Sequence, residues 1–209
     1  MILPCFYNPP LSFFAMIACS EEPVSIEQYD HYTKQTYRNR CRIYGANGVI
    51  DLVIPVVKEH GKKVRMKDIR IDYDTSWNSI HWKSIVSAYA SAPFFEFMAD
   101  LYQPVYEGSY KFLYDLNSEL IRITLNQLNI ERKISLSDTF TPLLKENNPA
   151  EAIHPKRAYH LKGFEFSPVP YHQVFIDRYG FKQDLSILDL LFNEGPDAQM
   201  ILKSSLIRL

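Results

Sequence analysis

The side chains best suited to chemistry stand in one basic run, YTKQTYRNR, from Tyr32 to Arg40. If the end of this run is extended, Arg38 and Arg40 share one face, while Asn39 points to the other. Two guanidinium groups on one face can hold a phosphate or carboxylate through forked hydrogen bonds, and Lys34 can add a point charge. The run is therefore a candidate anion-binding site, and the alternative is a charged surface with an ordinary ion pair.

A second group, His81-Trp82-Lys83, stands at the predicted start of a helix. His81 titrates near neutral pH and could act as a catalytic acid or base, Trp82 could stack on a ring, and Lys83 adds charge. The alternative for His81 is a structural hydrogen-bonding role. Both groups are polar islands beside core-forming segments. We therefore expect the segment 38–40 and His81 to border one cleft, with Asn8 at its rim as a further substrate-binding residue.

The charge of the chain is unevenly distributed. The net charge is −1, yet residues 31–83 hold 11 Lys and Arg against 5 Asp and Glu. A locally basic region in a near-neutral protein favours a small anionic ligand over a nucleic acid. The predicted partner is therefore a small anion and no nucleic acid is expected. A solvated face with scattered charges is the alternative.

Several common sites are excluded by the motifs that the sequence lacks. It has no GxGxxG, GxxxxGK[ST], GxSxG or HExxH pattern, which argues against dinucleotide, P-loop, hydrolase and zincin chemistry. Three widely spaced cysteines and six histidines without ligand spacing predict neither a disulfide framework nor a metal site. The sequence indicates no particular cofactor. The cysteine usage, and apolar runs too short to cross a bilayer, predict a cytoplasmic protein without a transmembrane segment.

The elements around the basic run predict a mixed fold. Apolar residues 2–7, the break at Asn8-Pro9-Pro10 and the apolar run 11–19 are typical of the strand, loop and helix that open an α/β domain. Alternation over 40–44, the turn signal Asn47-Gly48 and the apolar stretch 49–57 indicate a hairpin. Residues 68–73 alternate again and predict a further strand, so we interpret 40–73 as an insertion of antiparallel hairpins. The fold is thus predicted as α/β, with α+β as the alternative.

The second half is predicted to be mostly helical. Apolar residues recur at helical spacing in 82–89, 94–105 and 113–123, and again in 185–192 and from Pro196 to Leu206. The segment 141–160, rich in Asn and Pro, is predicted to be a mobile loop or a lid. The length suits one domain, 1–209, with one core.

Five segments, taken in order, resemble a known family. They are Leu3-Pro4 through Tyr7-Asn8-Pro9-Pro10 with Phe13-Phe14, KQTYRNRCRI (34–43), HWKSI (81–85), APFFEFMADLYQPVY (92–106) and LSILDLLFNEGPDA (185–198). Together they are similar to the WbqC-like family of bacterial proteins.

This resemblance implies a context in O-antigen and related surface-polysaccharide biosynthesis. It also implies an acyl or aminoacyl transferase, glycine being the suggested group, that acts on an activated sugar such as a nucleotide-linked sugar. The alternative is a non-catalytic accessory protein of envelope assembly, for which the apolar stripe from Phe94 to Tyr106, if exposed, would be the interface. The residues themselves establish no enzyme activity and no oligomeric state.

Overall fold

A parallel sheet and a helix open the chain in the computed structural model, which describes residues 1–57, 63–131, 134–137, 139–140, 148–157, 159 and 163–209. Strand β1 (Ile2–Pro4) leads through the Asn-Pro-Pro break into helix α1 (Leu11–Cys19). Strands β2 (Val24–Glu27) and β5 (Ile134–Leu136) complete a parallel sheet of order β1-β2-β5. The predicted α/β opening is confirmed: β1 and β2 are parallel, and helix α1 forms the crossover connection that parallel neighbours require.

The basic run ends at an antiparallel hairpin. Strands β3 (Arg40–Gly45) and β4 (Gly48–Val53) pair with Arg40 opposite Val53 and Gly45 opposite Gly48. Gly48 has a φ of 105°, a conformation that favours glycine at this turn. Cys41 and Ile43 point into the core, whereas the alternate positions Arg40 and Arg42 are only partly buried.

The rest of the predicted insertion is not a second hairpin. The segment 68–73, predicted to be a strand, contains the end of a 3-10 helix, η1 (Met66–Asp68), and isolated bridges. Ile71 bridges to Val56 and Arg70 bridges to Phe112, so the backbone of this segment is divided between two neighbours. Pro55, which lacks a donor N–H, limits continuation of the ladder beyond β4.

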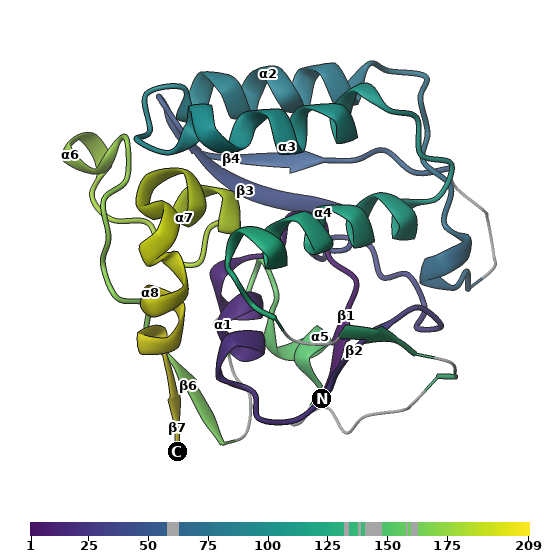
Figure 1. Cartoon of the computed structure of the whole chain (residues 1–209). Helices are drawn as coiled ribbons and strands as arrows, with labels where there is room; N and C mark the ends of the chain where they lie inside the picture. The colour runs from purple at the N-terminus through teal and green to yellow at the C-terminus, as the bar shows by residue number, and fades with distance from the viewer. Residues whose placement is uncertain (58–62, 132–133, 138, 141–147, 158, 160–162) are drawn as a thin grey trace.

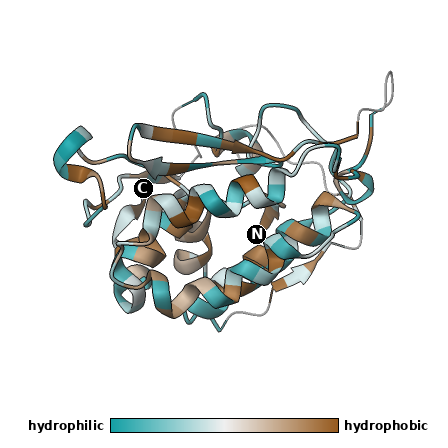
Figure 2. Cartoon of the chain, turned by 90° about the horizontal axis from the view of Figure 1, so that it is seen from above, coloured by the Kyte–Doolittle hydropathy of each residue, from teal (hydrophilic) through white to brown (hydrophobic). Residues whose placement is uncertain are grey.

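Three helices follow the hairpin along the chain. They are α2 (Trp77–Tyr89), α3 (Phe95–Glu107) and α4 (Leu113–Gln127), and Figure 1 shows α2 and α3 running alongside β3 and β4. Apolar positions recur along the helices between polar ones, as the alternating brown and teal of Figure 2 shows. The predicted helices at 82–89, 94–105 and 113–123 are confirmed.

The C-terminal part is a smaller set of elements that closes the core. They are α5 (Pro149–Ala152), β6 (Phe164–Phe166), α6 (Ile176–Tyr179), α7 (Ile187–Glu194), η3 (Gly195–Asp197), α8 (Ala198–Ser205) and β7 (Leu206–Arg208). Strands β6 and β7 pair antiparallel. Gly195, which follows the last residue of α7, has a φ of 50°. A Cβ at this position would lie within 3 Å of the ring of Phe94, the residue before α3, so only glycine fits here. Within the predicted loop 141–160, α5 is helical, while residues 141–147, 158 and 160 lie outside the described part.

One apolar core joins the two halves of the fold. Its fully buried aromatic residues come from the chain after β1, from α1 to α3 and from α7, and include Phe6, Tyr7, Phe13, Tyr89 and Phe192. In the described part of the chain, every helix is too short or too polar to cross a bilayer. The observed fold is mixed α/β: a parallel sheet with helices, an antiparallel hairpin and a mostly helical second half.

Asn117 on α4 connects the opening strand to the basic run. Its buried amide Nδ2 donates to the carbonyl of Arg38 at 2.8 Å and, more weakly, to that of Cys5 at 3.4 Å. We predict that Asn117→Ala lowers the free energy of unfolding by about 1–3 kcal/mol, because buried carbonyls lose their donor. Urea unfolding measures this change. Asn126→Ala, at an exposed position of the same helix, is the control; an equal effect of both variants would contradict this role.

Candidate functional site

The basic run divides into an exposed turn and a buried end. Lys34 is exposed in a turn, whereas Arg38 and Asn39 are buried in the bend that precedes β3. Arg40 is the first residue of β3 and is half-buried. Because the extended backbone starts only at Arg40, the strand alternation expected between positions 38 and 40 does not describe Arg38.

Arg38 is a paired cation. Its guanidinium forms an ion pair with Asp30 and also donates to the hydroxyl of Thr36 at 3.4 Å. The side chain is 5% exposed, so this pair is largely removed from solvent. A buried charge is tolerated when it is paired and hydrogen-bonded in this way. Arg38 therefore has a structural partner before any ligand is considered.

Arg40 has a different environment. Its Nε is buried and has no hydrogen-bond partner among the described residues. The charges of Arg40 and Arg38 both lower the pKa of Tyr32, although burial, the larger effect, raises it. Both guanidinium groups therefore lie near the Tyr32 phenol. A guanidinium can present several N–H groups to an oxyanion, so Arg40 is suited to bind one.

His81 lies in a buried hydrogen-bond network rather than at a surface. Its Nδ1 is 2.9 Å from the hydroxyl of Tyr7, which donates to the hydroxyl of Tyr106 at 3.1 Å. Asn8 Nδ2 also donates to Tyr106, at 2.7 Å. The tautomer of the His81 imidazole determines whether Nδ1 donates to the Tyr7 hydroxyl or accepts from it. Burial lowers the pKa of His81 to about 4, against a smaller raising effect from the backbone of Val53, so the imidazole is neutral.

Asn8 is interior and not at a rim, being 1% exposed. It takes a φ of 36°, in the left-handed region that asparagine tolerates better than most residues. This bend between β1 and α1 places its amide against Tyr106. Asn8 Oδ1 is buried without a hydrogen-bond partner among the described residues, as is Oδ1 of Asn39.

The other two predicted residues on α2, Trp82 and Lys83, lie outside this hydrogen-bond network. Trp82 is half-buried and stacks on Tyr106 and Phe95, with ring centroids 5.5 and 6.3 Å apart, so its ring faces are used in packing. Lys83 is exposed and lines an open pocket of about 330 Å³ beside the hairpin turn, together with Gly45 and Ile50.

The structure thus brings the predicted residues together in two groups. Asn8 and His81 belong to the Tyr7–Tyr106 network, whereas Arg38 and Arg40 lie near Tyr32. Asn39 lies between the two groups: its Nδ2 donates to the carbonyl of Ile54 at 2.7 Å, and the neighbouring backbone of Val53 acts on His81. Lys83 belongs to neither group by its described contacts.

Two residues that sequence reasoning did not select also lie near the basic run. Lys156 Nζ donates to Oε1 of Gln35 at 2.5 Å, and the charge of Arg40 contributes to lowering the pKa of His154. Both residues fall in the segment predicted to be a mobile loop. The basic sequence His154-Pro155-Lys156-Arg157 is the signal that could have found them.

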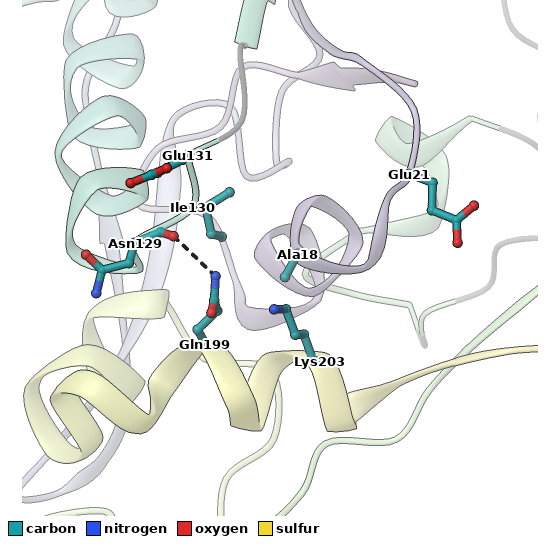
Figure 3. A pocket seen from close by; sticks show the side chains of 7 residues that line it. All are labelled: Ala18, Glu21, Asn129, Ile130, Glu131, Gln199 and Lys203. Carbon is teal, nitrogen blue, oxygen red and sulfur yellow. Dashed lines mark hydrogen bonds between the residues drawn. The ribbon is translucent and has the colours of Figure 1, made fainter.

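A pocket away from these groups contains none of the predicted residues. It has a volume of about 440 Å³ and lies between the ends of α1 and α4 and the face of α8, as Figure 3 shows. Its charged lining residues are Glu21, Glu131 and Lys203, and Gln199 donates to the carbonyl of Asn129 across its floor at 3.4 Å. Within the described ranges, no three His, Cys, Asp or Glu side chains are grouped as metal ligands.

We predict that His81 gives stability a distinct pH dependence. Its pKa is about 4 in the folded protein and about 6.5 when unfolded, so only the unfolded state binds a proton between these values. The free energy of unfolding contributed by His81 therefore rises by about 3 kcal/mol as pH increases through this window. Urea unfolding from pH 4.5 to 7.5 should show a smaller rise for His81→Gln than for the wild type.

Two buried carboxyl groups act in the opposite direction. Burial raises the pKa of Asp184 and of Asp189 to about 6, against hydrogen bonds that lower it. Between about 3.8 and 6 the folded state therefore holds protons that the unfolded state releases, and their contribution to stability falls as pH rises. The informative quantity is the difference between wild type and His81→Gln at each pH. A difference that does not change with pH would contradict a buried neutral His81.

Comparison with known proteins agrees with the order of motifs along the chain. The model of the WbqC-like protein family matches residues 5–159, which include both groups of site residues. The uncharacterized protein Rv1507c of Mycobacterium tuberculosis (strain ATCC 25618 / H37Rv) is 27% identical over 217 residues, covering 92% of each chain. No solved structure matches the chain. Because the family model covers about three quarters of its length, including α1, the hairpin and α2 to α4, the chain belongs to the WbqC-like protein family.

Proposed function

We propose that the chain binds a small phosphate-bearing anion, such as a nucleotide-linked sugar, at the basic run from Lys34 to Arg40. The observation that carries this proposal is the state of Arg40, whose Nε is buried without a hydrogen-bond partner among the described residues. An unmade hydrogen bond to a buried donor costs about 1–3 kcal/mol, and an oxyanion would remove that cost. In this proposal Arg40, rather than Arg38, is the central residue that binds the phosphate.

The pairing of the neighbouring charged residues supports this role of Arg40. Arg38 is paired with Asp30 and Arg42 with Asp51, so their charges are already balanced. Lys34, exposed in the preceding turn, can add a mobile charge to a bound phosphate. Asn39, next to Arg40, holds the turn against β4 and so acts on the position of the guanidinium rather than on the ligand.

Membership of the WbqC-like family supports a more specific proposal about the reaction. We infer an enzyme of bacterial surface-polysaccharide, or O-antigen, biosynthesis that transfers an acyl or aminoacyl group, glycine being one candidate, to an activated sugar. In this reaction His81 does not meet the substrate directly, because its ring is buried and bonded to Tyr7. Its part is to fix Tyr7 and, through Tyr106, Asn8, or to pass a proton along that network.

We expect Arg40→Lys to weaken anion binding, because a lysine keeps the charge but loses the planar fork of donors. The loss of a charge-assisted hydrogen bond of about 1.5–3 kcal/mol corresponds to roughly ten- to a hundred-fold in affinity. Isothermal titration calorimetry with a uridine diphosphate sugar and with pyrophosphate, at fixed pH and salt, measures the change.

Arg122→Lys is the matched control for this experiment. Arg122 is an exposed arginine on α4 that pairs with Glu119, outside the basic run, and its replacement by lysine makes the same chemical change. We expect the affinity of this variant to stay within about two-fold of the wild type. If the wild type binds neither anion at millimolar concentration, or if both variants lose affinity equally, the proposed anion site is wrong.

A second candidate function is a non-catalytic accessory protein, and one observation favours it. Phe97 is 77% exposed and Leu101, one turn later on α3, is 43% exposed. The ring of half-buried Phe94 lies 6.5 Å from that of Phe97. Large apolar side chains grouped at a surface are typical of protein interfaces. The other apolar residues of α3, such as Met98 and Tyr102, are buried, so only this face of the helix is available to a partner.

The two candidates predict different results for a Phe97→Ser/Leu101→Ser variant. Both positions are exposed, so we expect the variant to fold and to bind pyrophosphate like the wild type. The accessory function predicts that it fails to restore surface polysaccharide in a strain that lacks the gene, whereas the enzyme predicts full restoration. Polysaccharide profiles on gels distinguish the two outcomes. The Arg40→Lys variant is tested in parallel, because only the enzyme function requires Arg40.

A further inference from the structure

A turn from the second half of the chain packs its polar side chains against the basic run. The turn, residues 154–157, follows helix α5, which packs beside β1 (Figure 1). Lys156 Nζ donates to Oε1 of Gln35 at 2.5 Å, a contact between residues 121 positions apart. The charge of Arg40 has a smaller lowering effect on the pKa of His154 than burial and the charge of Arg157. The Lys156–Gln35 contact therefore joins the turn to the run as neighbouring basic segments.

The cations of this surface are not equally neutralised. Arg38, Arg42 and Arg157 each form an ion pair with a carboxylate. Within the described part of the chain, Arg40 has no such pair, and its buried Nε has no acceptor. Positive charge that protein carboxylates leave unbalanced, close to a buried donor, is suited to an anionic ligand.

Lys156 and His154 add donors of two kinds. The hydrogen bond described for the Lys156 ammonium goes to a neutral amide, so its charge is not cancelled by that contact. His154 Nδ1 accepts a hydrogen bond from the backbone N–H of Lys156 at 3.1 Å. An imidazole nitrogen that accepts is unprotonated, so the neutral ring carries its proton on Nε2. The turn thus fixes His154 as a neutral donor through Nε2.

We propose that Arg40, His154 and Lys156 together bind one phosphate group of the ligand, with the turn 154–157 as the second side of the site. This inference rests on the anion site proposed above and deepens it, because it adds a separate segment to that site. Arg40 supplies guanidinium N–H groups, His154 a neutral N–H and Lys156 a point charge.

This arrangement selects a ligand class. One full cation from each segment and one neutral donor match a terminal phosphate or a diphosphate, which presents several oxygens with more than one negative charge. A carboxylate, with two oxygens and a single charge, cannot engage the three groups in the same way. Pyrophosphate should therefore bind more tightly than acetate or succinate at the same ionic strength.

The test is calorimetry of the full chain with pyrophosphate at pH 7.5 and fixed salt. We expect Lys156→Ala and His154→Ala each to weaken binding about ten-fold, the effect of one lost hydrogen bond to a charged group. His154→Gln should keep most of the affinity, because its amide N–H can replace Nε2–H. Lys203→Ala, an exposed lysine on α8, is the control and should bind like the wild type.

The outcomes separate this inference from the proposed function. If pyrophosphate binds and Arg40→Lys weakens it, while Lys156→Ala and His154→Ala bind like the wild type, the second side of the site is wrong and the anion site stands. If the wild type does not bind, the proposed function itself is contradicted. Lys156 is exposed, so Lys156→Ala decides the matter even if a His154 variant fails to fold.

Discussion

The network of buried hydrogen bonds around Tyr7 and Asn8 connects the parts of this fold that carry its candidate site. Buried hydroxyl and amide groups must find partners, and here the partners come from separate elements: His81 on α2 and Tyr106 on α3. Asn117 on α4 donates to the carbonyls of Cys5 and Arg38. The segment between β1 and α1 is thereby fixed to three helices, and the basic run is fixed with it.

This anchoring places the two arginines of the run in different environments, so that Arg38 has an acidic partner and Arg40 has none among the described residues. Arg38 is held in the interior, where an unpaired charge would be costly, and Asp30 neutralises it. Arg40 is two residues later, at the start of β3, and its buried Nε has no hydrogen-bond partner among the described residues. The same backbone thus produces one arginine with a structural partner and one that is available to a ligand.

The sequence predicted the main elements because their signals are local. The apolar periods of α2, α3 and α4, the Asn47-Gly48 turn and the break at Asn8-Pro9-Pro10 depend on neighbouring residues only. It failed at 68–73, where alternation indicated a strand but the backbone divides its hydrogen bonds between Val56 and Phe112. Such sharing is decided by tertiary contacts that no local pattern records.

The site was less predictable than the fold for the same reason. The residue types of the basic run indicated an anion site. They did not indicate that Arg38 would form an ion pair with Asp30, or that His81 would be buried in a hydrogen bond with Tyr7. The sequence predicted His81 at the start of a helix, but α2 begins at Trp77, so His81 lies one turn inside the helix and packs against the rings of Tyr7 and Trp77. His154 and Lys156 come from a segment with few apolar anchors, where breaker residues indicate a loop but not its neighbours.

The most direct test of the account is a crystal structure of the chain with bound pyrophosphate. The account predicts a phosphate oxygen about 2.7–2.9 Å from Nε of Arg40, the usual length of a charge-assisted hydrogen bond, with the Arg38–Asp30 pair unchanged. A pyrophosphate bound instead at the pocket beside Lys203, or one that displaces Asp30 from Arg38 and leaves Arg40 without a contact, would contradict it.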